Sequence, residues 1–235
     1  MEVKKALLEQ KETRLKGNIY HNTQIIFSYN TNRIEGSELT EEEVRLIFET
    51  NSTPDKTVNV DDVIEATNHF RMFDFMLETL DDMLTEELIK EFQQLLKRGT
   101  SDERREWFNI GEYKLLANEV GGTITTSPKK VPEEMKSLLK WYNSLKDITL
   151  EQIVEFHYKF EKIHPFQDGN GRVGRIIMFR ECLKNNIMPF IIEDDNKYYY
   201  YRGLKEYTQE PGYLLETCLN SQDNYLKLVE IFLTE

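Results

Sequence analysis

Apolar residues recur along most of the chain with the three- and four-residue spacing of one helix face. This periodicity predicts helices over residues 63–80, 88–96, 135–145, 153–160 and, after Pro211, 215–229. Residues 40–43 and 149–152 match the capping box, in which Thr40 and Thr149 satisfy free N–H groups at a helix start. Gly99 is placed to end the second of these helices. The pattern therefore predicts a mainly α-helical fold.

One stretch, residues 110–128, breaks the helical pattern. It contains glycines and β-branched residues and ends at Pro128, a composition typical of a short, irregular β-hairpin. We therefore expect one β-hairpin among the helices.

Residues 164–175 read His-Pro-Phe-Gln-Asp-Gly-Asn-Gly-Arg-Val-Gly-Arg and separate two predicted helices, the second over residues 172–185. The proline disfavours continuation of the first helix. We expect Gly169 and Gly171 to take positive φ angles and to let the backbone approach an anion closely. The free N–H groups at the start of the second helix attract phosphate, as does its dipole. The loop is therefore a candidate phosphate-binding site.

The charged side chains of this loop suggest chemistry beyond binding. Arg172 and Arg175 supply two permanent cations one helical turn apart. Asp168 would oppose an anion unless a divalent cation bridges it to the phosphates. His164, at the mouth of the loop, could deprotonate an attacking hydroxyl. Taken separately, these residues also fit an ordinary turn, a solvated helix face and a structural histidine.

Residues 164–175 resemble, without gaps, the signature of the Fic family, His-x-Phe-x-(Asp/Glu)-Gly-Asn-Gly-Arg-x-x-Arg. The resemblance implies a Fic-type helical bundle with one short β-hairpin flap. It also implies transfer of AMP from ATP to a Ser, Thr or Tyr hydroxyl of a protein, with release of pyrophosphate. His164 would be the general base, Phe166 would anchor the loop in the core, and Asp168 would hold Mg²⁺, with Mn²⁺ as the alternative. The implied phosphate-binding residues are Gly169, Asn170, Gly171, Arg172 and, for the γ-phosphate, Arg175.

The resemblance also assigns roles outside the loop. Residues 110–128 would form the flap that holds the target protein by backbone pairing, with Gly121, Gly122 and Thr123 near the nucleotide. Four consecutive tyrosines start at Tyr198, and such a run cannot all face one core. By the resemblance, the residues that pack on the adenine are Tyr200, Tyr201 and Leu204. Thr208 stands where some relatives carry asparagine. A surface hairpin and core tyrosines are the structural alternatives.

Near the N-terminus, residues 18–36 predict a helix with Gly36 at its C-cap and Glu35 in its last turn. A carboxylate there is unfavourable unless it finds a cation, because it lies at the negative end of the helix dipole. The segment resembles the family's inhibitory motif, (Ser/Thr)-x-x-x-Glu-(Gly/Asn), with Thr31, Glu35 and Gly36 at the matching positions. The resemblance implies that Glu35 pairs with Arg175, denies it to the γ-phosphate and keeps basal activity low.

Length, net charge and cysteine content limit the other classes of protein to which the chain could belong. At 235 residues the chain suits a single domain, residues 1–235, that ends in helices over about 195–235. A net charge of −12 argues against a nucleic-acid binder. No apolar run approaches the roughly 20 residues that span a bilayer, and the start lacks a signal-peptide pattern. Cys182 and Cys218 cannot build a disulfide framework. We therefore expect a cytoplasmic protein without a membrane partner.

Three alternatives to AMP transfer from ATP stay open. Fic-type enzymes with the same loop can use another donor, and Glu35 could position a water that removes AMP from a modified target. A non-catalytic helical module that binds peptides through the hairpin is the third. The resemblance further implies self-modification and self-association into a homo-oligomer.

Overall fold

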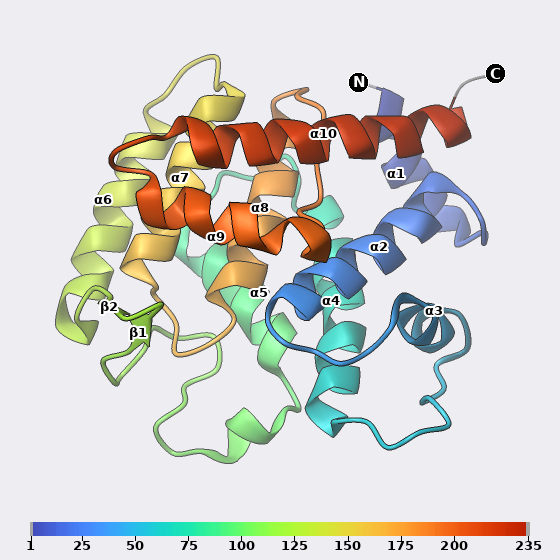
Figure 1. The fold of residues 1–235 in the computed structure, drawn as a ribbon, viewed down its shortest axis with the longest axis horizontal. Helices are drawn as coiled ribbons and strands as arrows, with labels where there is room; N and C mark the ends of the chain where they lie inside the picture. The colour runs from blue at the N-terminus through green and yellow to red at the C-terminus, as the bar shows by residue number, and fades with distance from the viewer. Residues whose placement is uncertain (1, 234–235) are drawn as a thin grey trace.

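The computed structural model describes residues 2–233, and within them the chain forms ten α-helices and one two-stranded antiparallel hairpin (Figure 1). The helices are α1 (Glu2–Thr13), α2 (Ile19–Ile34), α3 (Glu41–Thr50), α4 (Val60–Glu78), α5 (Glu86–Lys97), α6 (Val131–Asn143), α7 (Leu150–Ile163), α8 (Asn170–Lys184), α9 (Lys197–Glu206) and α10 (Gly212–Leu233). Three short 3-10 helices, η1 (Ser101–Arg104), η2 (Pro128–Lys130) and η3 (Asp194–Asn196), lie between them. The predicted mainly α-helical fold is confirmed.

Helix α8 is the centre of the fold. It packs beside α7 and also contacts α2, α4 and α5, while α9 and α10 lie together across one side (Figure 1). All of its residues except Gly171 and Lys184 are buried. A helix enclosed on all sides shows no polar face, so its buried charges, among them Arg172, Arg175 and Arg180, need partners from the neighbouring helices.

Local sequence signals set several helix boundaries correctly. The capping boxes at Thr40 and Thr149 are both formed, each with its reciprocal bond from Glu43 or Gln152. Helix α4 begins at Val60, three residues before the predicted start, because the Asn59 side chain caps it by accepting from the N–H of Asp61. Cap chemistry therefore decided the starts, and the apolar stripe decided which face is buried.

Two backbone predictions were wrong. Gly171 lies inside α8, which begins at Asn170, so of the two loop glycines Gly169 alone has a positive φ, 86°. The C-cap of α2 is Glu35, and Gly36 follows it with a φ of 99°. A glycine just beyond the cap takes the left-handed conformation that ends many helices.

The hairpin is shorter than the predicted segment. β1 (Glu119–Val120) pairs with β2 (Thr123–Ile124) in antiparallel register, and Gly121 and Gly122 form the turn with φ angles of 56° and 77°. The side chain of Ile124 is 80% exposed. Residues 110–118 and 125–127 are irregular, and the first of these segments contacts the loop between α7 and α8 instead of extending the sheet.

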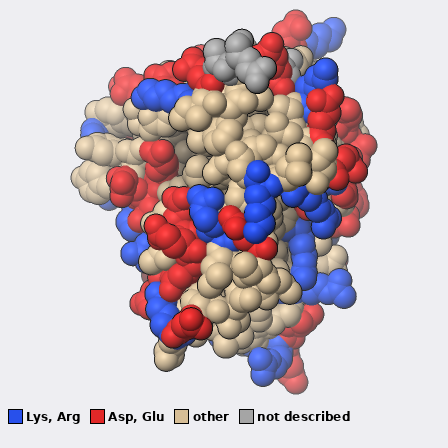
Figure 2. Space-filling model, turned by 90° about the vertical axis from the view of Figure 1, so that its right-hand side faces the viewer, with Lys and Arg blue, Asp and Glu red and all other residues tan. Residues whose placement is uncertain are grey.

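The surface agrees with the negative net charge. On the face drawn in Figure 2, acidic and basic side chains are interleaved, and the basic ones do not gather into one broad patch. Among the described helices, none is long and apolar enough to cross a membrane.

Candidate active site

The loop between α7 and α8 is held rigidly in the core. Phe166 is fully buried, as predicted, and its ring packs against those of Tyr113 and Phe160. The Asn170 side chain closes the loop on itself, because it accepts from the N–H of Phe166 at 2.8 Å and donates to the carbonyl of Phe166 at 2.9 Å. Asn170 is therefore engaged inside the loop, and the backbone at the start of α8 faces the site.

The start of α8 forms a cradle that holds a carboxylate. Gly169 provides no side-chain cap for the helix, and a β-carbon added to Gly171 would overlap Oε1 of Glu35 and lie 2.9 Å from Nη1 of Arg175. The Glu35 carboxylate thus lies directly over Gly171, where an anion meets the positive end of the helix dipole. Gly171 is needed for this close approach, whereas its φ is an ordinary helical one.

Arg175 contacts two other predicted site residues. Its Nη2 lies 2.6 Å from Oε1 of Glu35 and 3.0 Å from the carbonyl of Thr31, and its Nε donates to the Thr31 hydroxyl at 2.8 Å. The guanidinium is buried, while the Glu35 side chain is 31% exposed. The structure therefore brings together Thr31, Glu35 and Arg175 from distant parts of the chain.

Tyr200, expected at the adenine, lies instead behind Arg175. Its ring is 1% exposed, its hydroxyl lies 2.7 Å from Nε2 of His157, and Nη1 of Arg175 donates to it at 3.4 Å. The helical period turns consecutive side chains to different faces of α9, and of the four tyrosines Tyr200 is the buried one. Tyr201 is 44% exposed and donates to the carbonyl of Ile34. Leu204 is partly buried and packs against the apolar cluster that contains Tyr200. In this structure Tyr200 presents no open face to an adenine.

His164 ends α7 in a left-handed conformation, with φ 52°. Its side chain is 15% exposed, and Nδ1 lies 3.9 Å from Oε2 of Glu161 without a hydrogen-bond partner among the described residues. Burial and then the nearby Lys114 cation lower the pKa of His164 to about 4. The imidazole is therefore neutral at pH 7 and can accept a proton.

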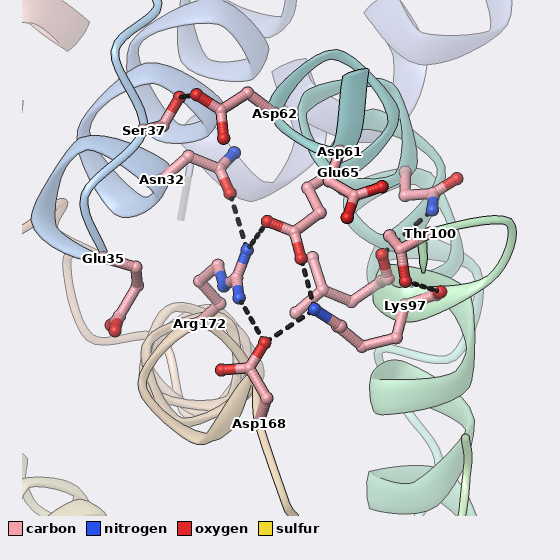
Figure 3. Close-up of polar contacts among 12 residues, drawn as sticks. Asn32, Glu35, Ser37, Asp61, Asp62, Glu65, Lys97, Thr100, Asp168 and Arg172 are labelled. Atoms are coloured by element: carbon pink, nitrogen blue, oxygen red, sulfur yellow. Dashed lines mark hydrogen bonds and ion pairs between the residues drawn. The ribbon is translucent and has the colours of Figure 1, made fainter. Parts of the chain in front are cut away.

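Asp168 lies between two cations. Its Oδ2 accepts from Nζ of Lys97 at 2.6 Å and from Nη2 of Arg172 at 3.2 Å (Figure 3). Burial alone would raise the pKa of this carboxyl, but Arg172 and Lys97 outweigh it and hold the pKa well below its usual range. Among the described residues, no group of three or more His, Cys, Asp or Glu side chains is placed so that it could hold a metal ion by itself. A single ionised carboxylate suits a cation such as Mg²⁺, which usually binds through one or two carboxylates and the substrate's phosphates.

The base of the hairpin is tied to the loop between α7 and α8. The N–H of Lys114 donates to the carbonyl of Pro165 at 2.8 Å, and the Asn118 side chain donates to the carbonyl of Phe166 at 3.3 Å. The Lys114 ammonium bonds both Asn118, at 2.8 Å, and Thr125, at 2.6 Å. Gly121 and Gly122 of the turn and Thr123 at the start of β2 are exposed beyond this base.

Several residues of the site were missed from the sequence. Lys97 and Glu65 hold Asp168 and Arg172, and Glu161 lies mostly buried beside His164, with its side chain 13% exposed. Burial first, and Glu35 second, raise the pKa of Glu161 to about 8. From sequence alone, a lysine or glutamate on a helix is normally predicted to be solvent-exposed. The packing of the helices is what shows that these three residues belong to the site. One weak signal existed, since Lys97 directly follows the apolar Leu95-Leu96 pair.

Residues 83–182 match the model of the Fic/DOC family. The chain is 25% identical over 189 residues to protein adenylyltransferase fic-1 of Caenorhabditis elegans, covering 77% of this chain and 36% of that protein. It is 29% identical over 185 residues to protein adenylyltransferase Fic of Drosophila melanogaster, covering 75% and 36%. The chain thus spans about a third of the length of these curated relatives.

Solved structures show the same fold. A Fic domain containing signaling protein of Bacteroides thetaiotaomicron superposes with a TM-score of 0.71 at 25% identity, covering 95% of this chain and 89% of that one. Fic-1 of Caenorhabditis elegans superposes with a TM-score of 0.72 at 20% identity, covering 96% and 69%. The second likeness concerns the fold alone.

Proposed function

Since the chain belongs to the Fic/DOC family, we propose that it transfers AMP from ATP to a Ser, Thr or Tyr hydroxyl of a protein. The curated relatives at 25% and 29% identity carry the name protein adenylyltransferase. The observation that carries the proposal is the grouping of three elements within one loop: a neutral histidine, an uncapped helix start, and two buried arginines. These are a base, an anion cradle and fixed positive charge.

In the proposed reaction the hydroxyl oxygen forms a bond to the α-phosphorus of ATP. The bond between that phosphorus and the oxygen bridging to the β-phosphate breaks, and pyrophosphate leaves with the electron pair. His164 accepts the hydroxyl proton. Arg172, Arg175 and the N–H groups at the start of α8 hold the phosphates and stabilise the charge that develops on them. Positioning and charge neutralisation supply most of the catalysis in such transfers.

A divalent cation, Mg²⁺ or Mn²⁺, would complete the site through Asp168. When bound, the ion neutralises charge on the phosphates and orients them. The depressed pKa of Asp168 supports this role, because the carboxylate is ionised at any physiological pH. ATP and the cation are thus the proposed substrate and cofactor.

We propose that Glu35 restrains this activity. Its carboxylate lies over Gly171, where it occupies the position of a bound anion. It also pairs with Arg175, the residue proposed to bind the γ-phosphate. ATP that binds around it would lack one of its cations, and its α-phosphorus would be misaligned. Displacement of Glu35 would therefore raise the rate of AMP transfer.

The target protein would bind along the flap. The exposed pair β1 and β2 is tied to the catalytic loop through Lys114 and Asn118, which supports a role in holding an extended segment near His164. Of the predicted adenine contacts, Tyr201 and Leu204 are the ones whose side chains are at least partly open. The same flap would serve self-modification.

Incorporation of α-labelled ATP into protein tests this proposal. Wild type, Glu35→Gly and Glu35→Gly/His164→Ala are compared with Mg²⁺, and Glu38→Gly serves as the control because Glu38 is exposed just beyond α2. We expect label in the Glu35→Gly protein, little in wild type and Glu38→Gly, and none in the double variant. Absence of label from every variant, with both self-modification and a cell lysate as targets, would contradict AMP transfer.

A further inference from the structure

A buried ammonium lies among three carboxylates beside the catalytic loop. Nζ of Lys97, at the end of α5, is 2.5 Å from Oε1 of Glu65, 2.7 Å from Oδ2 of Asp102 and 2.6 Å from Oδ2 of Asp168 (Figure 3). The Lys97 side chain is 3% exposed. Neither Lys97 nor Glu65 belongs to the loop motif, yet both contact its charged residues.

These contacts close into a ring of alternating charges. Glu65 uses one carboxylate oxygen for Lys97 and the other for Nη1 of Arg172. Asp168 completes the ring because its Oδ2 accepts from both Lys97 and Arg172. Figure 3 shows the other Asp168 oxygen turned away from Lys97. The ring thus joins α4, α5 and α8 to the loop and leaves one oxygen of Asp168 outside it.

We propose that Glu65 and Lys97 are positioning residues, which fix Arg172 and Asp168 and set the affinity of Asp168 for a divalent cation. The inference rests on the proposed function, in which Asp168 receives that cation together with ATP. The ring supplies two buried cations, Lys97 and Arg172, to Asp168, so without a nucleotide a divalent ion meets a carboxylate whose charge is already largely neutralised. Phosphates then provide the missing negative charge, which couples cation binding to nucleotide binding.

The ring has a consequence that simple loosening of the fold cannot imitate. Removing the Lys97 charge leaves Asp168 less neutralised, so a divalent cation should bind more tightly. Removing the Glu65 charge takes one carboxylate partner from both Lys97 and Arg172, so the two cations neutralise Asp168 more strongly and the same divalent cation should bind more weakly. Charges this close interact strongly enough, even near a protein surface, for shifts of about tenfold in either direction. A purely structural defect would instead weaken binding in both variants.

The experiment is a Mn²⁺ titration of nucleotide-free protein, followed by the electron paramagnetic resonance signal of the free ion. Lys97→Met and Glu65→Gln are compared with Lys90→Met and Glu112→Gln, because Lys90 and Glu112 form an ion pair at 2.7 Å that also involves α5 but lies outside the ring. We expect about tenfold tighter binding in Lys97→Met, about tenfold weaker binding in Glu65→Gln, and wild-type values in both controls. Asp168→Asn added to Lys97→Met should abolish the gain.

Shifts in the same direction, or wild-type affinity in both ring variants, would overturn the inference, provided that circular dichroism shows both to be folded. If Lys97→Met does not fold, the isosteric Glu65→Gln protein decides alone, and an affinity equal to that of Glu112→Gln would count against the ring. The titration needs no catalysis. Opposite shifts in a protein that transfers no AMP would leave the ring standing and the proposed function refuted, whereas AMP transfer without such shifts would refute only the ring.

Discussion

Oε1 of Glu35 and Nη2 of Arg175 lie 2.6 Å apart although 140 residues separate them in the chain. The pair joins the C-terminal end of α2 to the first turns of α8, and it lies over the helix start that would receive phosphate. A carboxylate at the C-terminal end of its own helix is unfavourable, but here it gains a buried guanidinium and the positive end of a second helix dipole. Glu35 is therefore held by the site that it covers.

Glu35→Gln should raise AMP transfer by about ten- to a hundredfold, since a hydrogen bond between charged groups contributes about 1.5–3 kcal/mol and glutamine keeps the size but loses the charge. Initial rates of α-labelled AMP incorporation at saturating ATP measure the effect. Glu38→Gln is the matched control on the following exposed segment. Equal rates for the two variants would show that the Glu35–Arg175 contact does not restrain the reaction.

The pH dependence of AMP transfer should have its acidic limb near pH 4. Burial and the Lys114 cation lower the pKa of His164 to about 4, so the base is lost only when the pH falls through that value. The measurement is the initial rate of the Glu35→Gly protein between pH 8 and pH 5, where the rate should stay level. In Lys114→Met the limb should move to higher pH. A limb near the ordinary histidine pKa of about 6.5 in the Glu35→Gly protein would argue against the buried, neutral base.

Tyr200→Phe should reduce the free energy of unfolding by about 1–3 kcal/mol, because it leaves the buried Nε2 of His157 without its partner at 2.7 Å. Tyr201→Phe is the control, since its hydroxyl bonds the Ile34 carbonyl from a side chain that is 44% exposed. We expect a loss of at most about 1 kcal/mol there. Urea unfolding followed by tryptophan fluorescence separates the two. A larger loss in Tyr201→Phe would contradict the assignment of Tyr200 to the core.

Gly203→Ala should destabilise the protein by about 1–3 kcal/mol through overpacking of α9 against α10. A β-carbon at Gly203 would lie 2.7 Å from the Cα and 2.8 Å from the backbone nitrogen of Leu214, and backbone atoms cannot move aside. Gly212→Ala is the control, because its new β-carbon would meet only the flexible end of Glu210. Urea unfolding should leave Gly212→Ala within about 0.5 kcal/mol of wild type. Comparable losses in both variants would show that the close packing is unimportant.

Features that depend on neighbouring residues could be predicted from the sequence. The capping boxes at Thr40 and Thr149 formed because a hydroxyl and a residue three positions later meet within one helical turn. The apolar stripes predicted the helices for the same reason, and residues 164–175 contained a complete chemical motif. The predicted pairing of Glu35 with Arg175 came from resemblance to a family motif, since no local pattern links residues so far apart.

Tertiary structure decided the features in which distant segments meet. Lys97, Glu65 and Arg172 lie on three helices, and nothing along the chain indicates that their charges form one buried ring. Tyr200 faces the core instead of a ligand because the rotation of α9 against α10 selects one tyrosine of four. Gly171 is required by the carboxylate above it and not by its own φ. Local sequence therefore fixed the helices and the reactive loop, whereas burial between helices decided which charges and rings surround that loop, because desolvated groups must find partners wherever packing places them.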